Sequence, residues 1–370
     1  MRSLDKFRGC LIGGAAGDAL GYEIEFLDEA YIFQTFGVRG ITEYALHGGA
    51  ARISDDTQMT LFTATGLLVG TTRGMNRGIM APYQDYIALS YGDWLKTQTQ
   101  HFPLTDGFRY SWLVNVPDLF ARRAPGKTCL AALSSGKTGS IEDPINSSKG
   151  CGGVMRVAPI GVYFTDKNIS LREVDRIGAQ VAAITHGHDL GYIPAAALVH
   201  IIYRLADDPD ETVRGAVQSA VAAMKEEFCG SPHIADFVEL MELAVSLADS
   251  DKPDLDAIHL LGEGWVAEET LAIAVFCALR HSEDFDAALI AAVNHNGDSD
   301  STGAVAGNIL GTYLGYERIP EKYKNDLELR DTILQIADDL YNDCRMTEHG
   351  DYYDEVWVRK YIKMIYPERM

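Results

Sequence analysis

Residues 9–21 read GCLIGGAAGDALG, and residues 303–315 read GAVAGNILGTYLG. Each stretch has glycine at every fourth position: Gly9, Gly13, Gly17 and Gly21 in the first, and Gly303, Gly307, Gly311 and Gly315 in the second. On an α-helix this spacing places the glycines on one nearly smooth face. A glycine inside a helix costs about 1 kcal/mol relative to alanine, so close backbone contact must compensate. The pattern predicts two buried helices that pack tightly against neighbouring helices. One possible neighbour of each is the other glycine-rich helix.

Helical patterns also dominate the rest of the chain. Apolar or alanine-rich residues recur at helical spacing over residues 177–205, 212–228, 235–248, 264–280 and 303–315. Few runs alternate apolar and polar residues over the length of a strand. No low-complexity linker divides the sequence. We therefore expect a mostly helical protein with a single domain over residues 1–370.

The composition limits the partners of the chain. Its 370 residues include 53 Asp and Glu against 32 Lys and Arg, a formal net charge of -21. Such a field repels nucleic acid and anionic membranes, so we expect neither as a partner. The apolar run 10–16 is too short for a signal core or a membrane span. The six cysteines are scattered without a zinc-binding spacing, which is typical of a protein of the reducing cytoplasm.

Two acidic clusters lie far apart in the sequence and share one composition. They are Ser54-Asp55-Asp56-Thr57 and Asp298-Ser299-Asp300-Ser301-Thr302, each before a stretch of helical pattern. Taken alone, each is compatible with a helix N-cap. Two adjacent aspartates exceed what a cap needs, however, and the recurrence favours a shared role. Together the clusters offer six or more hard oxygen ligands, which suit Mg²⁺ or Mn²⁺ and predict a metal-dependent hydrolase.

Three more carboxylates lie near the first glycine-rich stretch: Asp18, Glu23 and Glu25. A carboxylate at this place would serve as a general base or orient a metal-bound water. The alternative is a solvated side chain beyond the end of a helix.

Weaker candidates come from a polar loop and from an apolar stretch. Residues 146–153, NSSKGCGG, contain glycines that would let backbone N–H groups approach a phosphate, but taken alone the segment is better interpreted as a plain surface loop. His186 and His188 fall in a stretch of helical pattern, where residues two apart do not share a face, so we expect no zinc pair. We expect one of them to be a buried, hydrogen-bonded histidine near the site. Trp265 is expected to lie in the core.

Taken in order, these motifs resemble the ADP-ribosylglycohydrolase family, which includes the dinitrogenase-reductase-activating glycohydrolases. The segments that carry the resemblance are 7–11, 17–21 with Glu25, 54–57, 152–159, 185–186, 264–269 and 297–303. The order and spacing of several motifs agree, which is more specific than one short string.

The resemblance implies an all-α fold, a compact orthogonal multi-helix bundle with a central metal-lined cleft. It implies two Mg²⁺ (or Mn²⁺) ions held by Ser54, Asp55, Asp56, Asp298, Asp300 and Ser301. It also implies hydrolysis of the glycosidic bond at C1″ of ADP-ribose carried by a protein or a small molecule. Glu25, or one of the ligands Asp55 and Asp56, would accept the proton of the attacking water. The substrate would contact Ser148, Gly150, Gly152, Met155 and His186.

Some positions depart from the family pattern. Ser54 and Ser301 stand where the family often has threonine, and the retained hydroxyl should preserve metal binding. Cys151 stands where the family often has asparagine, which alters the expected contacts to pyrophosphate or ribose. The stretch 94–135, rich in aromatic residues and arginine, matches no motif.

Two alternatives remain beside this interpretation. One is a two-metal phosphoesterase that acts on a nucleotide or sugar phosphate with the same ligands. The other is a non-catalytic relative that only binds ADP-ribose. The leaving group (arginine, serine, O-acetyl or a nucleic-acid end) is not selected by any motif.

Overall fold

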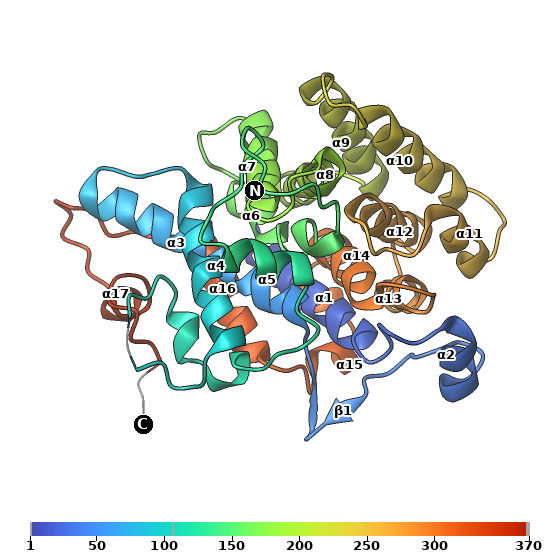
Figure 1. Cartoon of the computed structure of the whole chain (residues 1–370), viewed down its shortest axis with the longest axis horizontal. Helices are drawn as coiled ribbons and strands as arrows, with labels where there is room; N and C mark the ends of the chain where they lie inside the picture. The colour runs from blue at the N-terminus through green and yellow to red at the C-terminus, as the bar shows by residue number, and fades with distance from the viewer. Residues whose placement is uncertain (1, 106, 368–370) are drawn as a thin grey trace.

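The computed structural model describes residues 2–105 and 107–367, and within these ranges the chain is almost entirely helical (Figure 1). The described strands are β1 (Leu46–His47) and β2 (Ala50–Ala51), which form one antiparallel hairpin. The α-helices of the described ranges are α1 (Leu4–Gly21), α2 (Glu29–Phe36), α3 (Asp55–Arg77), α4 (Tyr83–Thr99), α5 (Lys127–Ser134), α6 (Ala158–Tyr163), α7 (Leu171–Ala183), α8 (Asp189–Asp207), α9 (Val213–Glu227), α10 (Ile234–Ala248), α11 (Asp254–Leu261), α12 (Ala267–Arg280), α13 (Phe285–Val293), α14 (Ser299–Leu314), α15 (Glu321–Lys324), α16 (Arg330–Asn342) and α17 (Glu355–Tyr361). The prediction of an all-α, multi-helix fold is confirmed.

The two glycine-rich stretches pack against each other as α1 and α14. Their glycines pair in antiparallel order: Gly9 with Gly311, Gly13 with Gly307, and Gly17 with Gly303. A Cβ atom added at Gly13 would lie 2.2 Å from the carbonyl oxygen of Gly307, and one added at Gly307 would lie 2.0 Å from that of Gly13. Both helices therefore need glycine, because backbone touches backbone along the contact. The prediction of two buried, closely packed helices is confirmed.

The segment between α7 and α8 corrects one predicted helix. The pattern over 177–205 predicts a single helix, but α7 ends at Ala183 and α8 begins at Asp189. Gly187 lies in the break, where an added Cβ would be 2.3 Å from the carbonyl oxygen of Asn146. His188 then caps α8, with its ring nitrogen Nδ1 accepting a hydrogen bond from the Leu190 N–H at 3.1 Å. A close tertiary contact and a new cap thus interrupt a pattern that is helical on both sides.

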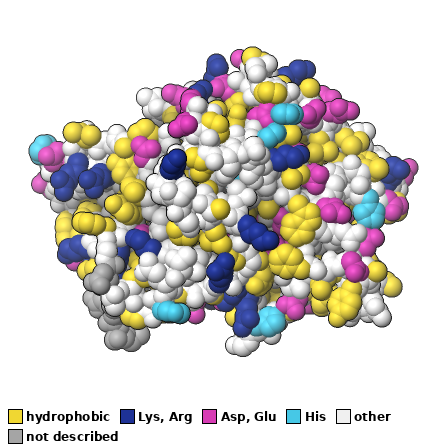
Figure 2. Space-filling view, viewed as in Figure 1, with side chains coloured by type: hydrophobic (Ala, Val, Ile, Leu, Met, Phe, Trp, Pro, Cys, Tyr) yellow, Lys and Arg dark blue, Asp and Glu magenta, His cyan; other side chains and the backbone are white. Residues whose placement is uncertain are grey.

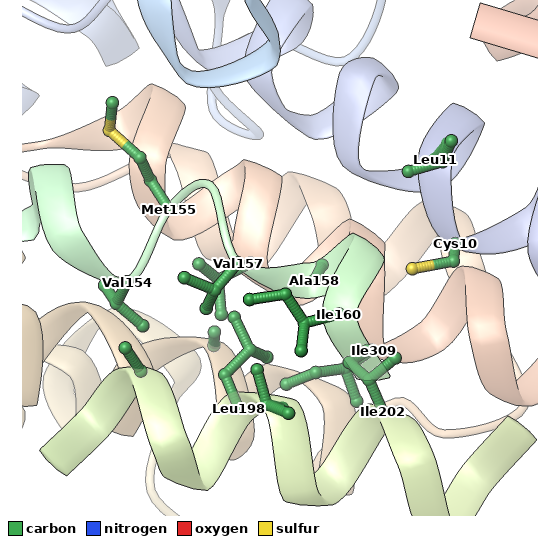
Figure 3. Close-up of a cluster of buried hydrophobic side chains, with 14 of the residues drawn as sticks. Cys10, Leu11, Val154, Met155, Val157, Ala158, Ile160, Leu198, Ile202 and Ile309 are labelled. Atoms are coloured by element: carbon green, nitrogen blue, oxygen red, sulfur yellow. The ribbon is translucent and has the colours of Figure 1, made fainter. Parts of the chain in front are cut away.

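One part of the apolar core is packed around α6 and α8. Figure 3 shows side chains of α6 and the segment before it packed against Leu198 and Ile202 of α8, with Ile309 of α14 beside them. All of these side chains are buried. Met155 points away from the other labelled side chains in this view, and its side chain reaches the candidate site described below. The site therefore rests on a rigid apolar base.

The helices are distributed around α1 and α14. Figure 1 shows α9, α10 and α11 together on one side and α3, α4 and α17 on the other, with α1 and α14 between them. Acidic and basic side chains are interspersed over the face shown in Figure 2. Within the described ranges, no helix is long and apolar enough to cross a membrane. The extent of the single domain, residues 1–370, stays a prediction.

Candidate active site

Three segments of the chain bring carboxylates to one pocket of about 560 Å³. They are the turn after α1, which carries Glu25, the start of α3 with Asp55 and Asp56, and the start of α14 with Asp298, Asp300 and Ser301. The two acidic clusters, distant in sequence, thus border the same space. Of the other predicted site residues, Gly150, Gly152, Met155 and His186 also line the pocket, whereas Ser54 and Ser148 do not.

Asp18, in the last turn of α1, holds the start of α3 in place. Its carboxylate accepts hydrogen bonds from the backbone N–H of Ser54 at 2.9 Å and of Thr57 at 3.0 Å, and from the Thr57 hydroxyl at 2.5 Å. Burial, and next the charge of Asp300, raises the pKa of Asp18 to about 7. Because its oxygens are engaged in these bonds, Asp18 positions α3 and is a poor candidate for a general base.

Glu25 is the carboxylate near α1 that faces the pocket. One of its oxygens lies within 4.8 Å of carboxylate oxygens of Asp298 and Asp300. Burial, followed by the charges of Asp300 and Asp298, raises the pKa of Glu25 to about 11. Glu23 instead lies near the surface, where it pairs with His47 at 2.7 Å. Of the three acids singled out near the first glycine-rich stretch, Glu25 therefore remains the candidate for proton transfer.

The two clusters differ as helix caps. Ser54 is the N-cap of α3, and its hydroxyl accepts a hydrogen bond from the Asp56 N–H at 3.2 Å. Asp298 occupies the N-cap position of α14, but its side chain makes no capping hydrogen bond. Gly297, with φ at 117°, turns the chain there, and the Asp298 N–H donates to the Glu263 carbonyl at 2.8 Å. Capping therefore accounts for Ser54 and leaves the Asp298 carboxylate without a capping role.

Some buried carboxylate oxygens in the pocket have no hydrogen-bond partner. Glu25 Oε2 and Asp56 Oδ2 are buried without a hydrogen-bond partner, whereas Asp55 Oδ2 accepts from the Gly126 N–H at 3.1 Å. Burial is the main cause that raises the pKa of Asp55, Asp56 and Asp298 well above the ordinary range, and neighbouring carboxylates add to it. Buried, unpaired carboxylates are costly unless they bind protons or cations.

The donor set fits a hard divalent cation. It consists of the carboxylates and hydroxyls of Ser54, Asp55, Asp56, Asp298, Asp300 and Ser301, and thus of oxygen alone. Ser54 is not among the residues that line the pocket. Burial raises the pKa of Asp300, and the side chains of Asp298 and Ser54 moderate that rise. The N-termini of α3 and α14 both lie at the cluster, and their partial positive charges offset part of the aspartate charge. The identity and number of the cations stay predictions.

Residues 146–153 form a structured wall of the pocket. The Asn146 side chain fixes this segment by donating to the Thr185 carbonyl at 2.8 Å and accepting from the Gly187 N–H at 3.1 Å. Cys151–Gly153 forms a short 3-10 helix. Ser148 lies outside the pocket lining, with its hydroxyl 3.2 Å from that of Thr128. The interpretation as a plain surface loop is therefore wrong for the glycines, which are partly or fully buried.

His186 reaches the pocket from the break between α7 and α8, and it is buried and neutral. Arg156 Nη2 donates to the Thr185 hydroxyl at 2.7 Å, and this hydroxyl lies 2.8 Å from His186 Nδ1. The hydroxyl can donate to Nδ1 while it accepts from Arg156, and in that tautomer His186 Nε2 is the N–H donor. Burial, with the charge of Arg156, lowers the pKa of His186 to about 3. His186 thus offers a neutral hydrogen-bond donor beside Gly150 and Gly152.

Sequence reasoning missed one wall of the pocket, residues 122–130. This segment brings two cations, Arg122 and Lys127, to a pocket that otherwise contains carboxylates. It is anchored by the Gly126 N–H on Asp55 and by an ion pair of Arg123 with Glu328. The segment lies within 94–135, where its arginines were a visible signal without a motif to place them.

Phe26 and Trp265 form an exposed apolar edge of the pocket. Their rings stack with centroids 6.2 Å apart and planes 20° apart, and 71% and 40% of the two residues is exposed. The prediction that Trp265 lies in the core is therefore wrong. Its backbone carbonyl accepts from the Cys151 N–H at 3.2 Å, which ties the backbone to the pocket wall while the ring remains in contact with solvent.

Comparison with known proteins places the chain in a family. The family model described as ADP-ribosylglycohydrolase matches residues 1–350. ADP-ribosylhydrolase ARH3 of Mus musculus is 25% identical over 365 residues and covers 88% of each chain. The ADP-ribosyl-(dinitrogen reductase) glycohydrolase of Rhodospirillum rubrum is 23% identical over 333 residues, covering 88% of this chain and 91% of its own.

A solved structure supports the fold. It is described as an ADP-ribosylglycohydrolase-related protein complex, and it superimposes with a TM-score of 0.59 at 23% identity, covering 92% of this chain and 98% of its own. The family match over nearly the whole sequence confirms the class of enzyme that the motifs predict, a hydrolase of glycosidic bonds. The chain belongs to the ADP-ribosylglycohydrolase family.

Proposed function

We propose that this protein hydrolyses the glycosidic bond at C1″ of ADP-ribose attached to a protein or small molecule, with two Mg²⁺ or Mn²⁺ ions bound in the pocket. The observation that carries this proposal is the pair of buried carboxylate oxygens without partners, Glu25 Oε2 and Asp56 Oδ2, in an otherwise all-oxygen cluster. The family and the names of the relatives supply the class of substrate.

The cations would be held by the two clusters. Asp55 and Asp56 would contribute from α3, together with the hydroxyl of its N-cap residue Ser54, and Asp298, Asp300 and Ser301 would contribute from α14. When bound, divalent cations would neutralise the carboxylates, hold vicinal ribose hydroxyls and lower the pKa of water.

The carboxylates of the chain would perform the proton transfer. With bound cations offsetting the charges of Asp298 and Asp300, Glu25 would be ionised and would accept a proton from the attacking water as the bond at C1″ breaks. Asp55 and Asp56 are the alternative acceptors. The positive charge that develops on the ribose ring would be stabilised by the surrounding carboxylates, which are held rigidly at two helix N-termini.

The rest of the pocket suits a diphosphate with a ribose on either side. Arg122 and Lys127 bring positive charge for phosphate oxygens. The neutral His186 would donate from Nε2 to an oxygen of the substrate. Gly152 has no room for a side chain, because an added Cβ would lie 2.9 Å from Cys129 Sγ. Glycine at this position therefore keeps the pocket wall free of side-chain atoms. The pocket, at about 560 Å³, has the volume of ordinary small-molecule sites.

The experiment is a panel of ADP-ribosylated substrates (arginine, serine, O-acetyl and a nucleic-acid end) assayed with Mg²⁺ or EDTA. We expect free ADP-ribose from at least one of them with Mg²⁺ only. Asp300→Asn should abolish turnover, and Mg²⁺ should raise the unfolding temperature of the wild type but not of this variant. Ser299→Ala is the matched control, because Ser299 lies between two proposed ligands and outside the pocket lining. Ser299→Ala should keep both the turnover and the rise in unfolding temperature with Mg²⁺.

Other outcomes would select other functions. Turnover that is unchanged by EDTA would refute the metal mechanism. Release of AMP or inorganic phosphate would indicate the two-metal phosphoesterase. Binding of ADP-ribose without turnover of any substrate would indicate a relative that only binds.

A further inference from the structure

A second cluster of metal-ligand type lies outside the pocket and is formed by His188, Asp189 and His233. His188 is the N-cap residue of α8, Asp189 is its first residue, and His233 is the N-cap residue of α10. One ligand atom from each of the three lies within 4.8 Å of the other two. The cluster joins two helix starts that are distant in sequence.

Two imidazoles converge on one carboxylate oxygen. Asp189 Oδ1 lies 2.9 Å from His188 Nδ1 and 2.8 Å from His233 Nδ1, and the ring centroids are 4.7 Å apart. Elsewhere in residues 2–105 and 107–367, the histidine–carboxylate pairs formed by His47, His200, His259 and His281 have one imidazole on one carboxylate. The cluster is therefore different in kind from these ordinary pairs.

Hydrogen bonding alone leaves this arrangement incomplete. The Leu190 N–H donates to His188 Nδ1 at 3.1 Å and to Asp189 Oδ1 at 2.9 Å. Without a proton, His188 Nδ1 can accept from the Leu190 N–H but cannot donate to Asp189; with a proton, it donates to Asp189 but cannot accept from Leu190. Hydrogen bonding through Nδ1 therefore serves one of these two neighbours at a time, whereas a cation would be coordinated by Nδ1 and the carboxylate oxygen together.

We propose that His188, Asp189 and His233 bind one transition-metal ion of the Zn²⁺ class. Two imidazole nitrogens and one carboxylate oxygen are donors that Zn²⁺ prefers, whereas Mg²⁺ prefers oxygen alone. The side chains of His188 and His233 are 24% and 42% exposed, so the ion has access from solvent, and water would occupy the fourth position. Ligand atoms of a tetrahedral zinc site are about 3.3 Å apart, so the side chains must separate by about 0.5 Å.

The bound ion would stiffen one wall of the pocket. The His188 N–H donates to the Ser148 carbonyl at 3.2 Å, and His186 lies two residues earlier in the same break. Coordination would tie this break to the start of α10. The inference itself is independent of the proposed reaction, because it rests on a different set of residues.

The test is calorimetric titration of Zn²⁺ into the full-length protein in millimolar Mg²⁺. The parent carries Cys229→Ser, because Cys229 is an exposed free thiol that would bind zinc on its own. We expect one Zn²⁺ per chain, with affinity at least tenfold lower in His233→Ala and in His188→Ala. His259→Ala is the matched control, since His259 is a similarly exposed histidine on a single carboxylate, Glu29, and its affinity should be unchanged.

Zn²⁺ should also raise the unfolding temperature of the parent and of His259→Ala, but not of His233→Ala. If the alanine variant does not fold, His233→Gln keeps a hydrogen-bonding side chain and replaces it. Unchanged affinity in a folded His233 variant, or no saturable binding by the parent, would overturn the proposal.

Discussion

Replacing Gly13 by alanine tests whether the contact between α1 and α14 determines the fold. The added Cβ would lie 2.2 Å from the carbonyl oxygen of Gly307 and 3.1 Å from the Cα of Gly311. Both neighbours are backbone atoms, so no side-chain rotation can relieve the overlap. The two helices would have to separate locally by about 1 Å to restore ordinary contact distances.

Two opposing contributions set the magnitude. Overpacking that shifts backbone costs up to about 3 kcal/mol, whereas alanine is favoured over glycine in a helix by about 1 kcal/mol. We therefore expect Gly13→Ala to lose about 2 kcal/mol of unfolding free energy. Gly92 provides the matched control: it lies inside α4, and a Cβ added there meets nothing within 4 Å. Gly92→Ala should gain about 0.5–1 kcal/mol.

Urea denaturation followed by circular dichroism measures both variants, and they should differ by about 3 kcal/mol. Gly307→Ala makes the same overlap from the other helix, with its Cβ 2.0 Å from the Gly13 carbonyl oxygen, so it should resemble Gly13→Ala. If Gly13→Ala were as stable as the wild type, or gained as much as Gly92→Ala, the argument from backbone contact would be refuted.

Three further predictions concern the pocket. Thr185→Val removes the hydroxyl between Arg156 and His186, so it should raise KM about tenfold in the hydrolase assay, and Thr185→Ser should restore it. In the folded chain, burial and Arg156 lower the pKa of His186 to about 3, so the unfolded chain binds a proton at this histidine more readily than the folded chain does. The contribution of His186 to stability should therefore fall as pH decreases from about 6.5 towards 3, and the unfolding temperature of His186→Gln relative to that of the wild type should rise over the same range. Lys127→Ala should raise KM for ADP-ribosylated substrates several-fold with kcat nearly unchanged, because its ammonium would bind phosphate away from the breaking bond.

The sequence predicts those parts of the fold that local pattern controls. Glycine at every fourth position has one physical use in a buried helix, which is close backbone approach, and α1 and α14 make that contact. The repeated acidic clusters could also be read from sequence, because paired aspartates exceed what a cap requires. Their meeting at one pocket follows from two contacts: the antiparallel packing brings the end of α1 beside the start of α14, and Asp18 at the end of α1 binds the start of α3.

Other features depend on contacts that leave no local pattern. The break at residues 184–188 has apolar helical pattern on both sides and exists because the chain approaches Asn146 closely at Gly187. The wall at 122–130 is positioned by long-range bonds to Asp55 and Glu328. Trp265 is a large apolar residue of the kind usually found in a core. Its backbone carbonyl is hydrogen-bonded to Cys151 at the pocket wall, and its ring lies at the exposed edge of the pocket.

The packing of α1 and α14 also explains how the chain can hold so many buried acids. Asp18 follows Gly17, which touches the carbonyl oxygen of Gly303, and from there it fixes the start of α3. The aspartates of both clusters thus lie at helix N-termini, where each macrodipole contributes roughly half a positive charge. Two half-charges offset only part of four aspartates and a glutamate, and burial, followed by the uncompensated carboxylate charge, raises the pKa values in the pocket. The protein can therefore fold with these groups protonated, and divalent cations that displace the protons would bind to a site already built.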